Sequence, residues 1–166
     1  FSDVRGFTAL SNSLSRRDVL ALLDDVFNAV VEGIQAHGGQ VLKFMGDGVL
    51  AVFTEGDGHS AEDVCKAAAE AADLVQTRLA ELRESRGAQG LPTASVGVGL
   101  HYGELTYGNI GAPGRLDFTV IGSSVNLAAR VESLCSKTGQ SVLATEAFVA
   151  CSSGWARVGA FPVKGL

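Results

Sequence analysis

Two carboxylates, Asp3 and Asp47, stand where a chain could place a metal site. Asp3 lies among apolar residues in the segment FSDVRGFT, and Asp47 lies between Gly46 and Gly48 at the junction of two apolar runs. A single carboxylate beside glycine is usually a turn residue that bonds its own backbone. Two carboxylates at the tips of strand-like runs can instead share divalent cations, which prefer oxygen ligands. These residues alone leave both interpretations open.

A polar pair, Asn126 and Arg130, is the second candidate for chemistry. The two residues are four apart in a segment with helical spacing, so they share one face of a helix. Asparagine is a poor helix-interior residue, because its amide competes for backbone hydrogen bonds. Such a pair is ordinarily a solvated surface feature. An amide and a planar guanidinium can also bind a phosphate or ribose together.

The apolar pattern predicts the elements that position these residues. Helices are expected to begin at Ser15 and Ser60, because each is followed three residues later by aspartate in a capping-box pattern. The first helix should end at the glycines 38–39 and the second near Gly87. Short apolar runs at 41–44 and 49–53 predict a β-hairpin with Asp47 in its loop.

The remaining elements follow from the same pattern. Strands are expected at 95–101, 104–110 and 118–121, and a helix at 124–137, before a short strand, helix and strand close the chain. Gly97 and Gly99 give the strand at 95–101 a glycine face, which lets a helix or backbone pack closely. Hairpins alternating with long helices favour an α+β fold with helices packed on a mainly antiparallel sheet.

Composition narrows the classes of function. The chain has 166 residues, which fits one domain, and 13 basic against 18 acidic side chains give a net charge of −5. This balance argues against a nucleic-acid-binding surface. No apolar run reaches the ~20 residues that cross a bilayer. The three cysteines and three histidines are isolated from one another, so we expect reduced thiols and no zinc site.

Three segments together resemble a known family. FSDVRGFT, KFMGDG and FTVIGSSVNLAAR, with V-K-G at 163–165, resemble the catalytic domain of class III nucleotidyl cyclases, which make cyclic AMP or cyclic GMP. The similarity follows the family's order over nearly the whole chain. It implies a ferredoxin-like, palm-like cyclase homology domain. We expect residues 1–166 to be a single catalytic domain, truncated at both ends, from a longer protein with unknown sensor domains. The domain is expected to be cytoplasmic, and the sequence leaves membrane anchoring of the longer protein open.

The resemblance assigns roles to individual residues. Asp3 and Asp47, with the Val4 carbonyl as a further ligand, would hold two Mg²⁺ ions, which Mn²⁺ can replace. The backbone N–H groups of Gly6, Phe7 and Thr8 would cradle phosphates. Arg130 would stabilise charge on the α-phosphoryl group, Asn126 would orient the ribose, and Lys164 would bind the terminal phosphates. Arg115 is close to the position of a second phosphate-binding arginine, but its register differs by about one residue.

Base choice rests on Lys43 and Thr119. Lysine donates and a threonine hydroxyl can accept, which complements the N1 acceptor and the amine donor of adenine. Guanylate-type relatives carry glutamate in place of Lys43, so ATP is the expected substrate. Threonine at 119 departs from the commonest adenylate pattern, which has aspartate there, and resembles a subclass often stimulated by bicarbonate. Asp117 lies two residues before this position and therefore does not correspond to that aspartate.

The family's sites form between two subunits, so the chain is expected to be a homodimer. Asp3 and Asp47 would come from one subunit and the remaining site residues from its partner. The alternatives are a guanylate cyclase and a catalytically weak regulatory dimerisation module, although such modules usually lose a metal aspartate or the arginine. A diguanylate cyclase is disfavoured, because its G-G-D/E-E-F signature is absent.

Overall fold

The computed structural model describes the backbone of residues 1–112 and 115–162 and the side chains of residues 1–109 and 120–162. Its elements run in the order β1 Ser2–Val4, α1 Phe7–Ser13, α2 Arg16–Ala36, β2 Gln40–Met45, β3 Gly48–Val52, α3 Ala61–Ala88, β4 Val96–Leu100, β5 Thr106–Ala112, β6 Arg115–Ile121, α4 Ser123–Thr138, β7 Val142–Ala144 and α5 Glu146–Val149.

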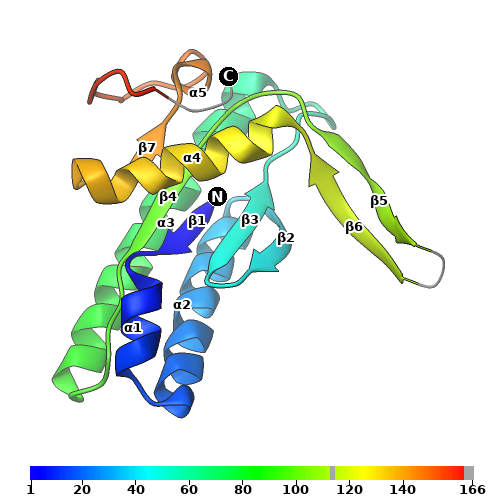
Figure 1. Cartoon of the computed structure of the whole chain (residues 1–166). Helices are drawn as coiled ribbons and strands as arrows, with labels where there is room; N and C mark the ends of the chain where they lie inside the picture. The colour runs from blue at the N-terminus through cyan, green and yellow to red at the C-terminus, as the bar shows by residue number, and fades with distance from the viewer. Residues whose placement is uncertain (113–114, 163–166) are drawn as a thin grey trace.

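The fold is built around a central sheet. Its strands lie in the order β2-β3-β1-β4-β7, and neighbours are antiparallel except for the parallel pair β4 and β7. Helices α2 and α3 pack together behind the sheet, whereas α4 crosses its front (Figure 1). Strands β5 and β6 form a separate ribbon that projects away from the sheet (Figure 1). The expected α+β fold with a mainly antiparallel sheet is confirmed.

The two long helices begin where their caps predict. The Ser15 hydroxyl accepts a hydrogen bond from the Asp18 N–H, and Ser60 and Asp63 form a reciprocal capping box. Helix α2 stops before Gly38, whose φ of 77° lies in the left-handed region. The main core lies between these helices and the sheet, and its buried members are Val4, Leu22, Val26, Val30, Ile34, Val49, Ala72, Val75, Leu79, Val96 and Val98.

The opposite face of the sheet is lined by glycine, which brings α4 close. A side chain on Gly97 would clash with the carboxylate of Glu132, and one on Gly99 would clash with the α4 backbone at Ala128. The expectation that this glycine face admits a helix is therefore confirmed. The arrangement seats α4 directly over β4 and beside β1.

Three local expectations differ from the structure. Helix α1 was not expected, because its sequence FTALSNS contains few strong helix formers. Strand β5 begins and ends two residues later than the expected 104–110, and β6 is longer than the expected 118–121, so that each is seven residues long and the two pair along their length. Residues 152–162 form no closing strand.

Candidate active site

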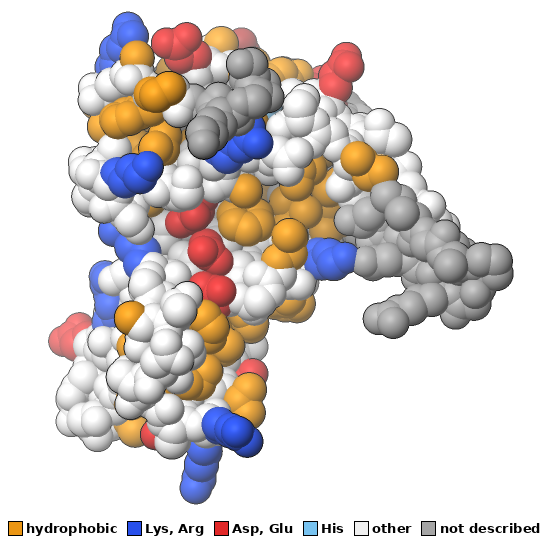
Figure 2. Space-filling view, in the orientation of Figure 1, with side chains coloured by type: hydrophobic (Ala, Val, Ile, Leu, Met, Phe, Trp, Pro, Cys, Tyr) orange, Lys and Arg blue, Asp and Glu red, His pale blue; other side chains and the backbone are white. Residues whose placement is uncertain are grey.

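The two aspartates lie side by side at one end of the sheet. Asp3 in β1 pairs with Gly48 of β3, which directly follows Asp47 in the β2–β3 loop. Since Gly48 has no side chain, the Asp3 carboxylate fits beside it, with Oδ1 3.0 Å from where a Cβ would stand. Figure 2 shows acidic side chains in the middle of this face, where Figure 1 shows β1 and that loop.

Electrostatics at this pair favour a cation. Burial, the charge of Asp47 and a hydrogen bond with Asp47 raise the pKa of Asp3 to about 6. Two half-buried carboxylates that repel each other are stabilised in their charged form by a divalent ion bound between them. Their oxygens are the hard donors that Mg²⁺ and Mn²⁺ prefer, so the residues present fit such an ion. Val4, whose carbonyl is the expected further ligand, is buried beside Asp3 in β1.

Backbone amides surround the turn after Asp3. Gly6 adopts φ 65°, and its carbonyl accepts from the N–H groups of Ala9 and Leu10. The N–H groups of Gly6, Phe7 and Thr8 precede or open the first turn of α1, where backbone donors have no partner within the helix. The Arg5 N–H donates to the Ser95 carbonyl at 2.8 Å. The candidate phosphate cradle therefore starts at Gly6.

Asn126 and Arg130 lie on the outer side of α4. The buried side of this helix carries Ala128, Val131, Glu132 and Cys135. At 3.6 residues per turn, Asn126 and Arg130 fall opposite that side, where the first is exposed and the second half-buried. Within the described part of the chain, neither side chain has a hydrogen bond or ion pair. A single subunit thus directs this pair away from its own aspartates.

The two residues that are expected to select the base lie in two separate strands. Lys43 is half-buried in β2, opposite Leu50 and next to a β-bulge. Thr119 lies in β6, opposite Gly108 of β5, and its side chain is outside the described residues. Lys164 and the side chain of Arg115 also lie outside them. The expected roles of these residues stay predictions.

Comparison with known proteins places this geometry in a family. The adenylate and guanylate cyclase catalytic domain family matches residues 1–165. The chain belongs to this family. This cyclase domain is 35% identical to an adenylate cyclase of Anabaena cylindrica over 153 residues, which cover 90% of the domain and 29% of that relative. The domain therefore spans less than a third of the length of that relative.

Similarity to solved structures supports the same family membership. The cyclase domain is similar to the adenylyl cyclase CyaB of P. aeruginosa, with a TM-score of 0.81, 32% identity and coverage of 90% of this chain and 76% of that one. It is also similar to the guanylyl cyclase Cya2, with a TM-score of 0.83, 30% identity and coverage of 99% and 83%. In the described part of the domain, no helix combines the length and apolar character needed to span a membrane.

A buried acid near Asp3 was missed by the sequence analysis. Glu132 of α4 is 6% exposed, and its carboxylate lies over Gly97, the residue that pairs with Asp3. Burial and the charge of Asp3 raise the pKa of Glu132 to about 7, while Arg5 acts in the opposite direction. The glycine face of β4 predicted close packing, but it did not say which side chain of α4 would fill the space.

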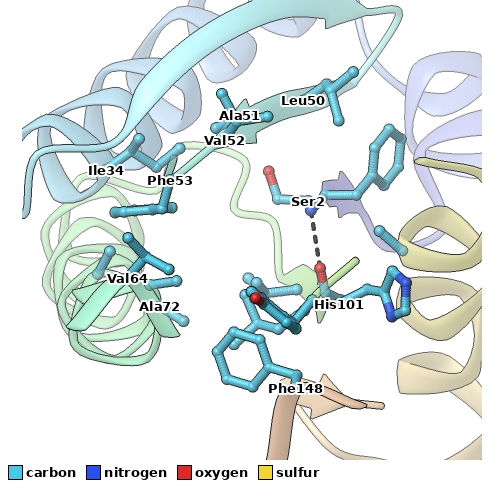
Figure 3. A pocket seen from close by; sticks show the side chains of 18 of the residues that line it. Ser2, Ile34, Leu50, Ala51, Val52, Phe53, Val64, Ala72, His101 and Phe148 are labelled. Atoms are coloured by element: carbon cyan, nitrogen blue, oxygen red, sulfur yellow. Dashed lines mark hydrogen bonds between the residues drawn. The ribbon is translucent and has the colours of Figure 1, made fainter. Parts of the chain in front are cut away.

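A mostly apolar cavity of the cyclase domain lies beside these polar residues without including them. It has a volume of about 270 Å³ and opens between β3, β4 and α3. Figure 3 shows mostly apolar side chains around it, including those of Val52, Phe53, Val64 and Phe148. None of the aspartates, Asn126 or Arg130 lines it. An apolar cavity of this kind does not suit a triphosphate, so the candidate site is defined by the chemistry of its residues and not by this cavity.

Proposed function

We propose that this domain is an adenylate cyclase, which converts ATP to 3′,5′-cyclic AMP and pyrophosphate. The ribose 3′-hydroxyl attacks the α-phosphorus in line, the bond to the bridging oxygen of the β-phosphate breaks, and pyrophosphate leaves. Membership of the cyclase family supports this reaction class. The single observation that carries the proposal is the pairing of Asp3 with Asp47 in a domain whose α4 presents Asn126 and Arg130 outward.

The aspartates would hold divalent cations, Mg²⁺ or Mn²⁺, together with the Val4 carbonyl. When bound, two such ions supply charge neutralisation of the triphosphate and activation of the attacking hydroxyl. No side-chain nucleophile is required, because phosphoryl transfer depends mainly on positioning and charge stabilisation. The raised pKa of Asp3 supports this role, since a bound cation would reduce the repulsion between Asp3 and Asp47.

The other residues bind and orient the nucleotide. The N–H groups of Gly6, Phe7 and Thr8 donate to phosphate oxygens, as successive free amides in a turn do. Arg130 donates to the α-phosphoryl oxygens as their charge changes, and Asn126 holds the ribose. Lys164 completes the set by binding the terminal phosphates.

Lys43 supports ATP over GTP. Its ammonium donates to adenine N1, whereas guanine presents a donor at N1 that would repel it. Thr119 accepts from the exocyclic amine of adenine. Guanylate cyclase activity is the second candidate, and the similarity to Cya2 is the observation in its favour. We further propose that bicarbonate stimulates the activity, because Thr119 resembles the subclass that bicarbonate often stimulates. Activity that does not change when bicarbonate is added at fixed pH and magnesium concentration would contradict this proposal.

The domain acts as a homodimer with two composite sites. We also propose that the domain lies in the cytoplasm. The outward direction of Asn126 and Arg130 supports shared sites, because these side chains cannot turn through α4 to reach their own subunit's aspartates. In a symmetric dimer each pair would face the other subunit's metal site.

Incubation of the purified domain with ATP or GTP, each with Mg²⁺ or Mn²⁺, tests the function. The expected main product is cyclic AMP, and Arg130→Ala should lower kcat for ATP about 10²-fold, the loss typical of removing one charge-stabilising donor. Arg157→Ala, in the segment after α5, is the control and should retain activity. Cyclic GMP as the main product would overturn the base assignment, and no cyclic product at all would favour a regulatory module.

A further inference from the structure

Glu132 is a buried acid that the proposed reaction does not use. It is 6% exposed on the inner side of α4. Among the described residues, no hydrogen bond to its carboxylate is found. Burying an ionisable carboxyl is costly unless a hydrogen bond or an opposite charge compensates it.

The surroundings of Glu132 concentrate negative charge. Its carboxylate lies over Gly97, the β4 residue opposite Asp3, and side chains on directly opposed strand positions are only ~5 Å apart. Asp3 and Asp47 act on Glu132 as like charges, while Arg5 and the amino group of Phe1 act as opposite ones. Three carboxylates thus converge on one patch of the sheet.

Arg5 does not neutralise this patch fully. Its guanidinium donates through Nη2 to the Gln140 carbonyl, and its Nε is buried with no hydrogen-bond partner. No ion pair between Arg5 and Glu132 is found in the described part of the chain. Within the described part of the chain, the Glu132 carboxylate thus has no hydrogen bond, and the buried Nε of Arg5 has no hydrogen-bond partner.

The position of Glu132 does not make it a direct metal ligand. Among the described residues, no three histidine, cysteine or acidic side chains are close enough to hold an ion together. Magnesium, however, keeps several water molecules when one or two carboxylates bind it. Groups that hydrogen-bond to those waters orient the ion and adjust its affinity.

We propose that Glu132 is a positioning residue of the divalent-cation site, accepting hydrogen bonds from water molecules bound to the cation that Asp3 and Asp47 hold. This inference rests on the proposed function, because it presupposes that the aspartates bind a cation. It adds a residue on α4 to a site otherwise built from β1 and the β2–β3 loop. Since the same helix carries Asn126 and Arg130, cation binding would also hold α4 in place.

Titration with Mn²⁺ alone, followed by the electron paramagnetic resonance signal of the free ion, tests this proposal. Glu132→Gln keeps the shape of the side chain and removes its charge, and it should weaken Mn²⁺ binding about 10-fold. Asp47→Asn should weaken binding further, and Glu84→Gln, exposed on α3, should leave it unchanged. Thermal unfolding followed by circular dichroism checks that each variant is folded. Glu132→Asp, which keeps the charge, should bind Mn²⁺ more tightly than Glu132→Gln.

Activity provides a second readout that a purely structural role would not move. Glu132→Gln should raise the Mg²⁺ concentration for half-maximal activity about 10-fold and recover most of kcat at saturating Mg²⁺. Wild-type Mn²⁺ affinity in Glu132→Gln, with loss in Asp47→Asn, would overturn the role of Glu132 and leave the proposed function standing. Unchanged affinity in Asp47→Asn would overturn both. A loss of kcat in Glu132→Gln that excess Mg²⁺ does not restore would also overturn the proposal.

Discussion

At the scale of single residues, Asp3 makes stability depend on pH. Its pKa rises from 3.8 to about 6 in the folded chain, so between these values the native state holds a proton that the unfolded chain releases. Stability without metal must therefore fall as pH rises from about 4 to about 6. The proton-linked cost is fully present above pH 6, where a cation would relieve it.

Asp3→Asn should remove this cost. In a metal chelator at pH 7.5, we expect the variant to be more stable than the wild type by about 1 kcal/mol, a value discounted for the solvent screening of a half-buried group. Near pH 4 the two proteins should have the same stability. Urea unfolding at several pH values measures the difference. A variant that is less stable than the wild type at pH 7.5 would contradict the repulsion between Asp3 and Asp47.

Lys43 should control which base is accepted. Lys43→Glu replaces a donor with an acceptor and should lower kcat/KM for ATP at least 10-fold relative to GTP, because buried donor and acceptor mismatches are costly. Lys66→Glu, at an exposed position on α3, is the matched control. Steady-state kinetics with both nucleotides provide the measurement. An unchanged ratio of the two kcat/KM values would mean that Lys43 does not contact the base.

The candidate residues were predictable to different degrees. Asp3 and Asp47 stood out because glycine flanks one and a strand-like run surrounds the other. Glu132 did not, since a glutamate on a predicted helix is ordinarily solvated and only three-dimensional packing places it over Gly97.

At the scale of elements, the position of α4 depends on the glycine face of β4. Gly99→Ala should displace the helix, because the new Cβ would clash with backbone atoms of α4 at Ala128 and Glu132 that cannot rotate away. We expect a loss of about 1–3 kcal/mol in stability, as in other overpacked cores. A shift of ~1 Å at Asn126 and Arg130 should also lower kcat by up to ~10²-fold.

Gly87→Ala is the matched control for this substitution. A Cβ at Gly87, near the end of α3, has no atom within 4 Å, so alanine should be neutral or slightly stabilising. Thermal unfolding and kcat of both variants test the prediction. Equal stability and activity in Gly99→Ala and the wild type would show that α4 tolerates displacement.

Local signals predicted the long elements well and the short ones poorly. Helices α2 and α3 begin with side-chain caps and carry continuous apolar stripes, so both were predicted nearly to the residue. Helix α1 lacks a side-chain cap and has few strong helix formers, and it forms beside the left-handed turn at Gly6. The parallel pairing of β7 with β4 joins distant segments, which no local pattern predicts.

At the scale of the whole molecule, one subunit separates its two sets of candidate residues. Asp3 and Asp47 lie on the sheet, whereas Asn126 and Arg130 point outward from the helix that covers it. The ribbon of β5 and β6 carries Thr119 away from the sheet (Figure 1). Within a lone chain these residues would not converge, so we propose that activity of this cyclase domain requires a second copy.

Mixing two inactive variants tests this central claim most directly. Asp47→Ala lacks the metal carboxylate, and Arg130→Ala lacks the phosphate-binding guanidinium, so each homodimer should be nearly inactive with ATP and Mg²⁺. In a mixed dimer one of the two sites keeps both groups. Equal amounts of the two variants, mixed at concentrations that support dimers, should therefore regain about a quarter of the wild-type activity, because about half the dimers are mixed and each has one intact site. Mixed dimers that form but yield no more cyclic AMP than the separate variants would contradict a shared active site.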